Sequence, residues 1–562
     1  MRLLIVLVMF LGLLPNAFSQ DLATMGQQKP FALSGSLDVR GIAYSADGIP
    51  ARRSPFMYMI SGSPTISIYG ISIPLSFVYS EQERNFRQPF NQFGMSPAYK
   101  WITVHAGYRN VSFSPYTLAG YTMLGGGFEL NPGKLRIGFM YGRLNRATTV
   151  DTTTGTIQPY SFSRFGYAGK VGYGTEDTHF DLSFLKAKDD EASLKVGNLD
   201  QSTVRPAENL VIGADTKVTF AKKLFIFADG AISVYTRDFQ SKLALSSEVT
   251  GTDIFNKVNK FITINGTSEY YIAYSGGIGY KEKDFSLKVA YKHVDPNFQS
   301  MGAYFFQSDI ENITISPSFN ALKGKLRFLG SLGIQNDNTQ KQKQATTKRV
   351  IGMANLSWDL TTAFGLDANY TNFSSNSEPT VTKVQNKYLL AQTNQNISVS
   401  PRLIIPAEKH TQVFLLSYNY SNLSDVNAET QAANNINTTV AMLNYNLTFN
   451  KSGLSLMAGG NYTTNVLTTG TITNKGATLG ASKGFLKNQL QFSTSNSYII
   501  STLPQGSSTI LNLGVNTSYQ PLRNHRLSLR VNYLNNKPSD DAKGGQPKFS
   551  ETTGELGYTL SF

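Results

Sequence analysis

The sequence predicts an all-β fold, in which a single large antiparallel transmembrane β-barrel of about 24 strands (roughly 22 to 26) takes up nearly the whole chain. Three observations support this prediction. Apolar and polar residues alternate over many short segments. The connections between these segments alternate between short and long. Only 16% of the residues are charged, against about 25% in soluble domains, although the chain holds 35 Phe and 29 Tyr. A wall whose residues alternately face lipid and water reconciles these aromatic residues with a mean hydropathy of −0.20.

The first 30 residues lie outside the predicted barrel. Residues 1–19 read as a secretory signal peptide, with an early Arg, an apolar stretch over residues 3–14 and a small-residue cleavage site at residues 17–19. The apolar stretch is too short to span a membrane as a helix. Residues 20–30 are then an N-terminal extension, and residues 31–562 form the barrel, with no sign of a second domain.

Strand alternation is clearest in six segments. In the first, Leu135, Ile137 and Phe139 alternate with Arg136 and Gly138. Such a period of two indicates a strand, because successive side chains of a strand point to opposite faces. The pattern recurs in residues 179–184, where the polar His179 and Asp181 alternate with Phe180, Leu182 and Phe184. It recurs again in residues 285–292, 326–335, 511–519 and 526–533. Its repetition predicts one continuous sheet, and closure of that sheet into a barrel would leave no exposed edge.

The connections fall into two classes. Short turns recur roughly every 35–60 residues, the length of a hairpin plus its outer loop in a transmembrane barrel. They lie at residues 131–134, 174–176, 221–223, 281–283, 322–324, 359–361, 406–408, 450–452, 483–485 and 521–523. Longer stretches rich in Asn, Thr, Ser and Asp lie between them, at residues 147–159, 189–206, 239–267, 336–348, 374–387, 422–439 and 536–547. This asymmetry predicts short periplasmic turns and long extracellular loops.

The C-terminal strand carries a resemblance to a known family. Residues 554–562 place Leu556, Tyr558, Leu560 and Phe562 on one face of a strand that ends the chain. This pattern resembles the C-terminal signal of Gram-negative outer-membrane β-barrels, with Tyr558, Leu560 and Phe562 as its specific part. The resemblance implies a location in the outer membrane, contact with outer-membrane lipid and insertion by the barrel-assembly machinery. From the nonapeptide alone, an ordinary amphipathic strand at the chain end remains the alternative.

One segment departs from the pattern. Residues 81–97 combine Arg84 and Arg87 with three Phe residues, and counting strands back from residue 131 places them among the short periplasmic turns. One interpretation is a segment folded into the pore as a constriction, and another is a dock for a periplasmic partner protein. A merely long turn, or an unrecognised strand, is the plainer alternative.

Several basic residues are predicted to face the lumen, because they alternate with the apolar positions of their strands. They are His105, Arg109, Arg136, Lys288, Lys292, Arg327, Arg526 and Arg530. A positive lumen would favour anions, in keeping with a net charge of +14. No basic run accompanies that charge, so nucleic-acid binding is not expected.

No catalytic or cofactor motif stands out. The chain has no Cys, which excludes disulfides and thiolate ligands, and its five His residues form no metal-spaced set. Two Gly-rich stretches, at residues 125–127 and 276–279, do not open a helix after a strand, so they do not predict a phosphate-binding loop. We expect no enzyme activity, no cofactor and no metal site, although residues distant in sequence can still converge on a site.

The expected function is therefore a porin-like channel or transport barrel for small hydrophilic, and preferentially anionic, solutes. Barrel-like alternation begins near residue 31, which leaves no room for an N-terminal plug domain. The alternative is a structural or export barrel of an outer-membrane complex, gated by periplasmic or surface partner proteins. That alternative stays open because a barrel of this size would enclose a wide aqueous lumen.

Overall fold

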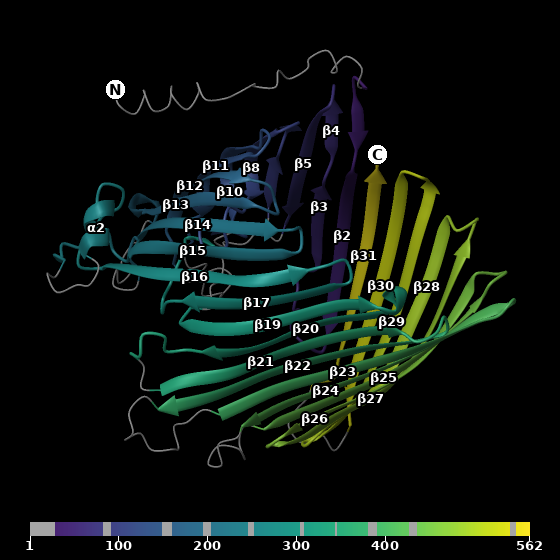
Figure 1. The fold of residues 1–562 in the computed structure, drawn as a ribbon. Coiled ribbons are helices and arrows are strands. Elements are labelled where there is room, and N and C mark those ends of the chain that lie inside the picture. The colour runs from purple at the N-terminus through teal and green to yellow at the C-terminus, as the bar shows by residue number, and fades with distance from the viewer. Residues whose placement is uncertain are drawn as a thin grey trace.

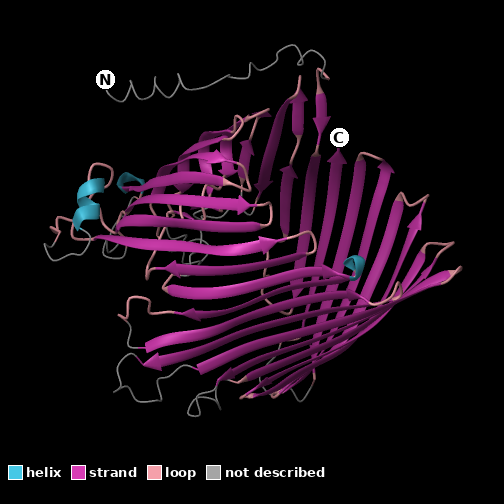
Figure 2. Cartoon of the chain, viewed as in Figure 1, coloured by secondary structure: helices cyan, strands magenta, loops and turns pink. Residues whose placement is uncertain are grey.

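The computed structural model describes residues 29–81, 91–148, 160–194, 204–245, 252–303, 308–342, 345–379, 391–425, 435–539 and 547–562. The predicted signal peptide and residues 20–28 of the predicted extension lie outside this range. The described chain is almost entirely strand, with short helical turns between strands (Figure 2). Among the described residues, no helix has both the length and the apolar character needed to cross a membrane.

The strands of the barrel wall follow one another in chain order. Its first half contains β1 (Ala32–Ser34), β2 (Ser36–Asp47), β3 (Phe56–Gly62), β4 (Thr65–Ile68), β5 (Ile71–Ser80), β6 (Gln92–Met95), β7 (Ala98–Tyr99), β8 (Ile102–Asn110), β10 (Thr122–Leu130), β11 (Leu135–Asn145), β12 (Ser163–Gly174), β13 (His179–Asp190), β14 (Glu208–Phe220), β15 (Leu224–Thr236), β16 (Ser268–Lys281) and β17 (Phe285–Val294).

The second half contains β19 (Ile310–Ala321), β20 (Leu326–Asn336), β21 (Ala345–Asp359), β22 (Phe364–Pro379), β23 (Ala391–Pro406), β24 (His410–Asp425), β25 (Ile436–Phe449), β26 (Leu454–Leu467), β27 (Gly470–Phe485), β28 (Leu490–Leu503), β29 (Gly506–Leu522), β30 (His525–Pro538) and β31 (Phe549–Ser561). The remaining elements lie in connections: β9 (Leu118–Ala119), β18 (Gly302–Ala303), the helix α2 (Thr252–Val258) and the 3-10 turns η2 (Glu191–Ser193) and η3 (Leu322–Gly324).

The wall closes into a single antiparallel barrel of 26 strands, which confirms the predicted fold class. The first strand, β2, pairs with the last, β31, over its whole length from Ser36 opposite Ser561 to Asp47 opposite Ser550. Figure 1 shows these two strands side by side at the C-terminus. Three strands of the wall are interrupted. Elements β1 and β2 together make up one strand of the wall, as do β3 and β4, and β6 and β7. Closure satisfies backbone hydrogen bonds that an open edge would leave unpaired in lipid.

The two ends of the barrel differ, as predicted. We call the end with the short connections the turn end, and the opposite end the loop end. The short turns lie close to their predicted positions, except that the turn expected at residues 483–485 falls instead at 486–489, after β27. Two connections at the loop end are also tight, between Leu467 and Gly470 and between Leu503 and Gly506. Gly470 and Gly506 have positive φ angles, which suit such hairpin turns.

The N-terminal wall holds turns that the sequence pattern did not reveal. A tight turn at Tyr69 and Gly70, both with positive φ, separates β4 from β5, and another at Lys100 and Trp101 separates β7 from β8. The prediction that residues 81–97 lie among the periplasmic turns is therefore wrong. Part of the segment is strand β6. The preceding strand β5 ends at Ser80 and β6 begins at Gln92, and both of these residues lie at the loop end of the wall. Residues 82–90, which include Arg84 and Arg87, lie outside the described residues.

The outer surface of the wall is apolar and the inner surface polar. On β13, Phe180, Leu182 and Phe184 are exposed on the outside, whereas Asp181 and Ser183 point inward and are buried. The same alternation holds along β30, where Leu527, Leu529 and Val531 face outward. Such an apolar outer surface on a closed antiparallel barrel suits an outer membrane.

A long connection covers part of the outside of the wall at the loop end. We call the described residues 237–245 and 252–267, which include α2, the outer flap. Its Phe255 and Ile262 pack against Leu210 and Val234, which are outward-facing residues of β14 and β15. Figure 1 shows α2 beside the ends of β14 to β16. The flap thereby buries wall residues that would otherwise face outward.

Deletion of Phe562 should lower the amount of barrel in the outer membrane. Phe562 exchanges two backbone hydrogen bonds with Gly35, at 2.8 and 3.1 Å, and so extends the pairing that closes the barrel. It also ends the strand that resembles the assembly signal. Membrane fractionation should show loss of the protein from the outer membrane and its accumulation in periplasmic aggregates. The variant Ser561→Ala, which keeps the chain length, should behave as the native chain, and unchanged abundance after the deletion would contradict a role in insertion.

Candidate functional site

The lumen is the candidate functional site, and one side of it is filled by two connections that fold inward. We call residues 111–121 and 295–303 the inner loops. They meet in a short parallel sheet, in which Leu118 of β9 lies opposite Gly302 of β18. Leu118 is fully buried, and Tyr116 packs edge-on against Phe298 with ring centroids 5.9 Å apart. The two loops therefore form one packed unit inside the barrel.

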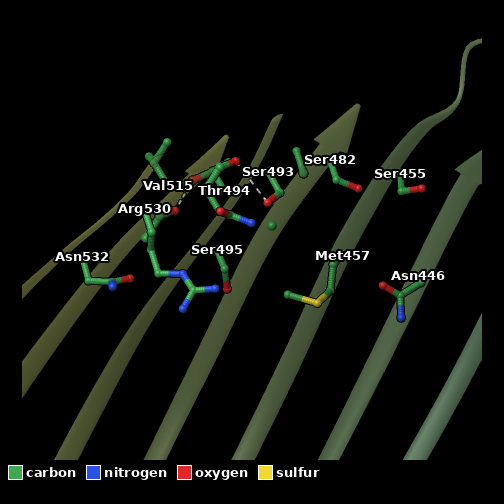
Figure 3. Close-up of a pocket in the computed structure, with 14 residues that line it drawn as sticks. Asn446, Ser455, Met457, Ser482, Ser493, Thr494, Ser495, Val515, Arg530 and Asn532 are labelled. Atoms are coloured by element: carbon green, nitrogen blue, oxygen red, sulfur yellow. Dashed lines mark hydrogen bonds between the residues drawn. The ribbon is translucent and has the colours of Figure 1, made fainter. Parts of the chain in front are cut away.

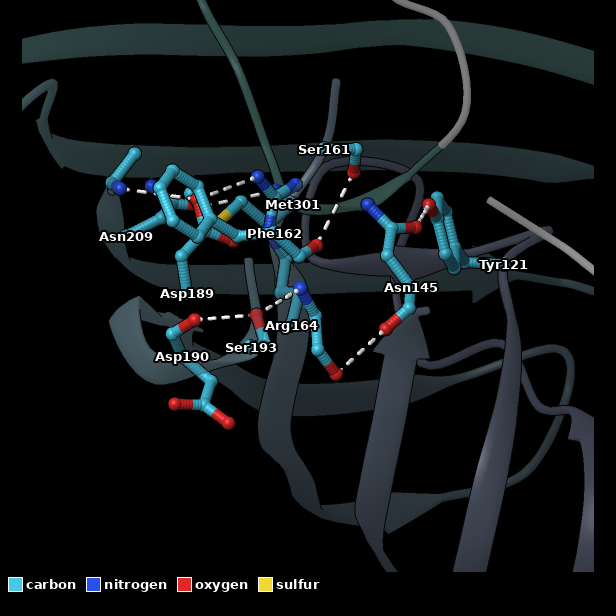
Figure 4. Close-up of polar contacts among 12 residues, drawn as sticks. Tyr121, Asn145, Ser161, Phe162, Arg164, Asp189, Asp190, Ser193, Asn209 and Met301 are labelled. Carbon is cyan, nitrogen blue, oxygen red and sulfur yellow. Dashed lines mark hydrogen bonds and ion pairs between the residues drawn. The ribbon is translucent and has the colours of Figure 1, made fainter. Parts of the chain in front are cut away.

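Side chains of the wall anchor this unit. The Thr117 hydroxyl donates a hydrogen bond to Ser183 of β13 at 3.2 Å, and the backbone N–H of Met301 donates to Asn209 of β14 at 3.0 Å. The Ser233 hydroxyl donates to the backbone carbonyl of Gln299 at 2.6 Å. These wall residues lie on the face opposite exposed apolar residues, so the contacts are made from the lumen side. Figure 4 shows Asn209 and Met301 together.

Glycines in the wall make room for the inner loops. A Cβ atom at Gly138 would lie 2.5 Å from the ring of Phe113, and one at Gly213 would lie 3.0 Å from the Thr117 methyl. Within the loops, a Cβ at Gly302 would lie 2.9 Å from Leu185 and from the carbonyl oxygen of Thr117. The close approach of loop and wall therefore depends on the missing side chains.

The apolar side chains of the inner loops and the nearby wall form the largest buried cluster. Its members come from both inner loops and from strands β10 to β17 and β19, and include Val111, Phe113, Tyr121, Met123, Met140, Leu185, Val211 and Ile310. Burial in this cluster raises the pKa of Tyr116 to about 12, and the nearby Asp229 carboxylate adds to the rise. Tyr116 is therefore an uncharged part of the unit at physiological pH. The filled side of the lumen is therefore a packed core.

Polar contacts fix the loop end of this filled side (Figure 4). Arg164 of β12 donates two hydrogen bonds to Asp189 of β13, at 2.7 and 3.2 Å, and the Asp189 side chain is 4% exposed. Asp189 also accepts a hydrogen bond from the backbone N–H of Ala207 at 3.0 Å. Tyr121, at the end of an inner loop, donates to Asn145 of β11. A buried carboxylate with an Arg and a backbone donor has its hydrogen-bonding demand met.

A row of acidic residues crosses the lumen wall beneath the inner loops. Asp181, Asp215 and Asp229 face one another on β13, β14 and β15. Basic residues stand at both ends of the row: Arg136 lies 3.1 Å from Asp181, and Lys288 and Lys292 are close enough to Asp229 to interact electrostatically. The lumen is therefore not uniformly positive on this side.

The opposite side of the lumen wall is hollowed. One hollow of about 310 Å³ lies over β25 to β30 and is lined by Arg530 and by small or uncharged residues, among them Asn516 and Asn532 (Figure 3). A second, of about 520 Å³, is lined by Arg52, Arg53 and Glu551 and shares Ser495, Gly514 and Asn532 with the first. The two hollows adjoin. Among the described residues that line them, the charged ones are three Arg and one Glu. We call them together the basic groove.

The structure brings the predicted lumen residues to the inside of the wall but separates them into different settings. His105 is buried and lies 2.9 Å from Ser96 and 3.1 Å from Glu129. Arg109 donates to Ser76 and to the carbonyl oxygen of Pro74. Lys288 lies over the Phe227 ring and Arg327 donates to Ser357, while Arg526 lies on the same face of β30 as Arg530, four residues away. Of this set, Arg530 lines the basic groove, and Arg136, Lys288 and Lys292 border the acidic row.

The residues of the predicted assembly signal lie on the outside of the last strand. Tyr558 and Leu560 share a face with Leu556, which is 61% exposed. The Tyr558 hydroxyl is 2.7 Å from Nδ1 of His525 on the neighbouring strand. Their role in assembly remains a prediction.

Sequence reasoning missed Asp215 and Asp229, the inner loops, and Arg52 and Arg53. It placed His179 and Asp181 on the polar face of a strand, but it held no information on which residue of the next strand faces them. The inner loops carried a readable signal: residues 111–121 are rich in apolar and aromatic residues, unlike the Asn- and Thr-rich connections elsewhere. A connection of that composition indicates burial rather than exposure.

The sequence matches no protein-family model and no curated protein. Several solved structures are similar at low identity. The translocation pore of the P pilus usher PapC is 8% identical, with 94% of this chain and 99% of that chain covered and a TM-score of 0.38. The FrpB iron transporter from Neisseria meningitidis (F3-3 variant) is 11% identical, with 97% and 83% covered and a TM-score of 0.38. OccAB2 of Acinetobacter baumannii is 11% identical, with 64% and 92% covered and a TM-score of 0.29. The fold therefore rests on the strand pairing of this chain alone.

Proposed function

We propose that this protein is a porin-like channel of the outer membrane that conducts small hydrophilic solutes with a preference for anions. The observation that carries the proposal is the division of the lumen into two sides. The inner loops fill the side beneath β10 to β17, and the basic groove lines the other side with three Arg residues and one Glu. A solute passing the inner loops would travel along the basic groove.

The lining of the groove supports small hydrophilic solutes. Around Arg530 the wall presents Asn446, Ser455, Ser482, Ser493, Ser495, Asn516 and Asn532, which are donors and acceptors without net charge. Such residues replace part of the hydration of a polar solute without holding it tightly, as conduction requires. The Arg residues would attract anions into this part of the lumen.

Purified protein in planar bilayers should show anion selectivity in a salt gradient. Replacing the groove arginines together, as Arg52→Ser, Arg53→Ser and Arg530→Ser, should lower the ratio of anion to cation permeability severalfold, because the groove then keeps only the Glu551 charge. A matched control removes three Lys residues that are exposed at the turn end, as Lys222→Ser, Lys451→Ser and Lys487→Ser. The control carries the same change in net charge and should shift the reversal potential much less. Cation selectivity of the native channel, or equal effects of the two triple variants, would contradict the proposal.

A further inference from the structure

His179 and two residues of the acidic row, Asp181 and Asp215, converge at one point on the lumen wall. His179 and Asp181 lie two positions apart on β13, and Asp215 faces Asp181 from β14. One potential ligand atom from each of the three lies within 4.8 Å of the others, and among the described residues no other group of three His or acidic side chains meets this geometry. Nε2 of His179 is 2.7 Å from Oδ1 of Asp215.

The contacts of His179 fix which of its ring nitrogens faces Asp215. Its Nδ1 lies 3.0 Å from the backbone carbonyl oxygen of Thr175, which can only accept, so Nδ1 carries the proton in this contact. Nε2 then points its lone pair at the Asp215 carboxylate, which is also an acceptor. The 2.7 Å contact is consequently favourable only with a second proton on the ring or with a cation shared by the two groups. A carbonyl on the far nitrogen of a His is the arrangement that orients metal-ligating His residues.

Asp181 supplies the second observation. Its side chain is 4% exposed, and its Oδ2 lies 3.1 Å from Arg136. Its other oxygen, Oδ1, is buried and has no hydrogen-bond partner. That oxygen lies over Gly172, where a Cβ atom would come within 1.8 Å of it. A buried carboxylate oxygen without a partner is costly, and a bound cation would satisfy it.

From these contacts we propose that His179, Asp181 and Asp215 bind a divalent first-row transition-metal ion of the Zn²⁺ type. One imidazole nitrogen and two carboxylate oxygens form a donor set that Zn²⁺ accepts, with further positions open to water. Ligands of such an ion stand about 3 to 3.5 Å apart, so the His179–Asp215 contact opens by less than about 1 Å on binding. Asp215 is 32% exposed and provides the approach from the lumen. Ca²⁺ takes about 6 to 8 oxygen ligands, so one imidazole nitrogen and two carboxylates suit an ion of the Zn²⁺ type better.

Two other His–acid pairs of the barrel serve as comparisons. His293 lies 3.1 Å from Asp295, and His105 lies 3.1 Å from Glu129. Neither pair belongs to a group of three potential ligands among the described residues. His293 therefore offers a matched control, because it pairs with a carboxylate on the same barrel but lacks the third ligand.

Two titrations of the purified, chelator-treated barrel test the site. One is isothermal titration with Zn²⁺, and the other is titration with Co²⁺ followed by the visible absorption of the bound ion. The native barrel should bind one Zn²⁺, and Asp215→Asn and His179→Asn should each weaken binding at least tenfold while His293→Asn leaves it unchanged. Heat-modifiable migration in SDS gels checks that each variant is folded. Absence of saturable one-to-one binding to the native barrel would overturn the proposal whatever the variants do. Equal binding by native protein and folded Asp215→Asn would also overturn it, because the ion then sits elsewhere.

Discussion

Deletion of residues 112–120 should raise the single-channel conductance by at least about twofold, because one of the two inner loops then no longer occupies the lumen of a barrel this wide. The remaining inner loop loses its partners as well, since Gly302 pairs with Leu118 and Ser300 donates a hydrogen bond to Thr117. Conductance in planar bilayers, measured at fixed salt and voltage, checks the expectation. The strands on either side, β8 and β10, pair directly with each other, so the wall itself retains its ladder.

A point substitution provides a milder version of the same test. In Gly302→Val the new side chain would collide with Leu185 and with the backbone of Thr117, which should displace the inner loops and raise the conductance or its fluctuations. The control is the same substitution at Gly554, where a Cβ atom meets nothing within 4 Å. If the deletion and Gly302→Val both insert normally and leave the conductance at the native value, the inner loops do not narrow the path.

The second large effect is expected at Lys186, whose replacement by Ala should destabilise the barrel by about 3–5 kcal/mol. The ammonium group of Lys186 donates a hydrogen bond to Glu208 at 2.6 Å, and their side chains are 10% and 6% exposed beneath the outer flap. Glu208 also accepts a hydrogen bond from the Thr263 N–H of the flap at 3.0 Å. Loss of Lys186 leaves a buried carboxylate without its cation. Equilibrium unfolding in urea, followed by tryptophan fluorescence in lipid vesicles, measures the change.

An exposed ion pair gives the matched control. Lys223 and Glu282 pair at the turn end with side chains 50% and 48% exposed. Lys223→Ala should leave the urea midpoint of unfolding nearly unchanged, because solvent screens exposed pairs. The double variant Lys186→Ala with Glu208→Gln should recover part of the loss, since it removes the buried charge. Equal effects of Lys186→Ala and Lys223→Ala would show that burial by the flap does not set the strength of the pair.

The barrel itself could be predicted because its signals are local. Alternation with a period of two is written into each strand, as along residues 134–141, and turn residues punctuate the chain independently of the rest. The observed 26 strands lie within the predicted range. The individual strands were hardest to place at the N-terminus, where β4, β6 and β7 are short and the turns at Tyr69–Gly70 and Lys100–Trp101 are two residues long. The missed turn at Lys100–Trp101 lies between residues 81–97 and the turn at residue 131, so it reverses the side to which residues 81–97 were assigned.

The lumen site could be predicted only in part, because pairing between strands is not local. Alternation put His179 and Asp181 on the inner face, but only the register of β13 against β14 brings Asp215 beside them. Likewise Arg52 and Arg530 lie far apart in the sequence and line adjoining hollows because β2 closes the barrel against β31. The apolar composition of residues 111–121 was the one local sign that a connection turns inward.

The claim that the lumen is an open path beside the inner loops is tested most directly by recording purified native protein alone in planar bilayers. The proposed channel predicts steady single-channel conductance without any added partner, together with an anion-selective reversal potential in a salt gradient. Co-purification from native outer membrane should then show the barrel travelling without a stoichiometric plug protein. Absence of conductance from correctly inserted barrels, or conductance only after a bound partner protein is stripped away, would contradict an open channel and favour a partner-gated barrel.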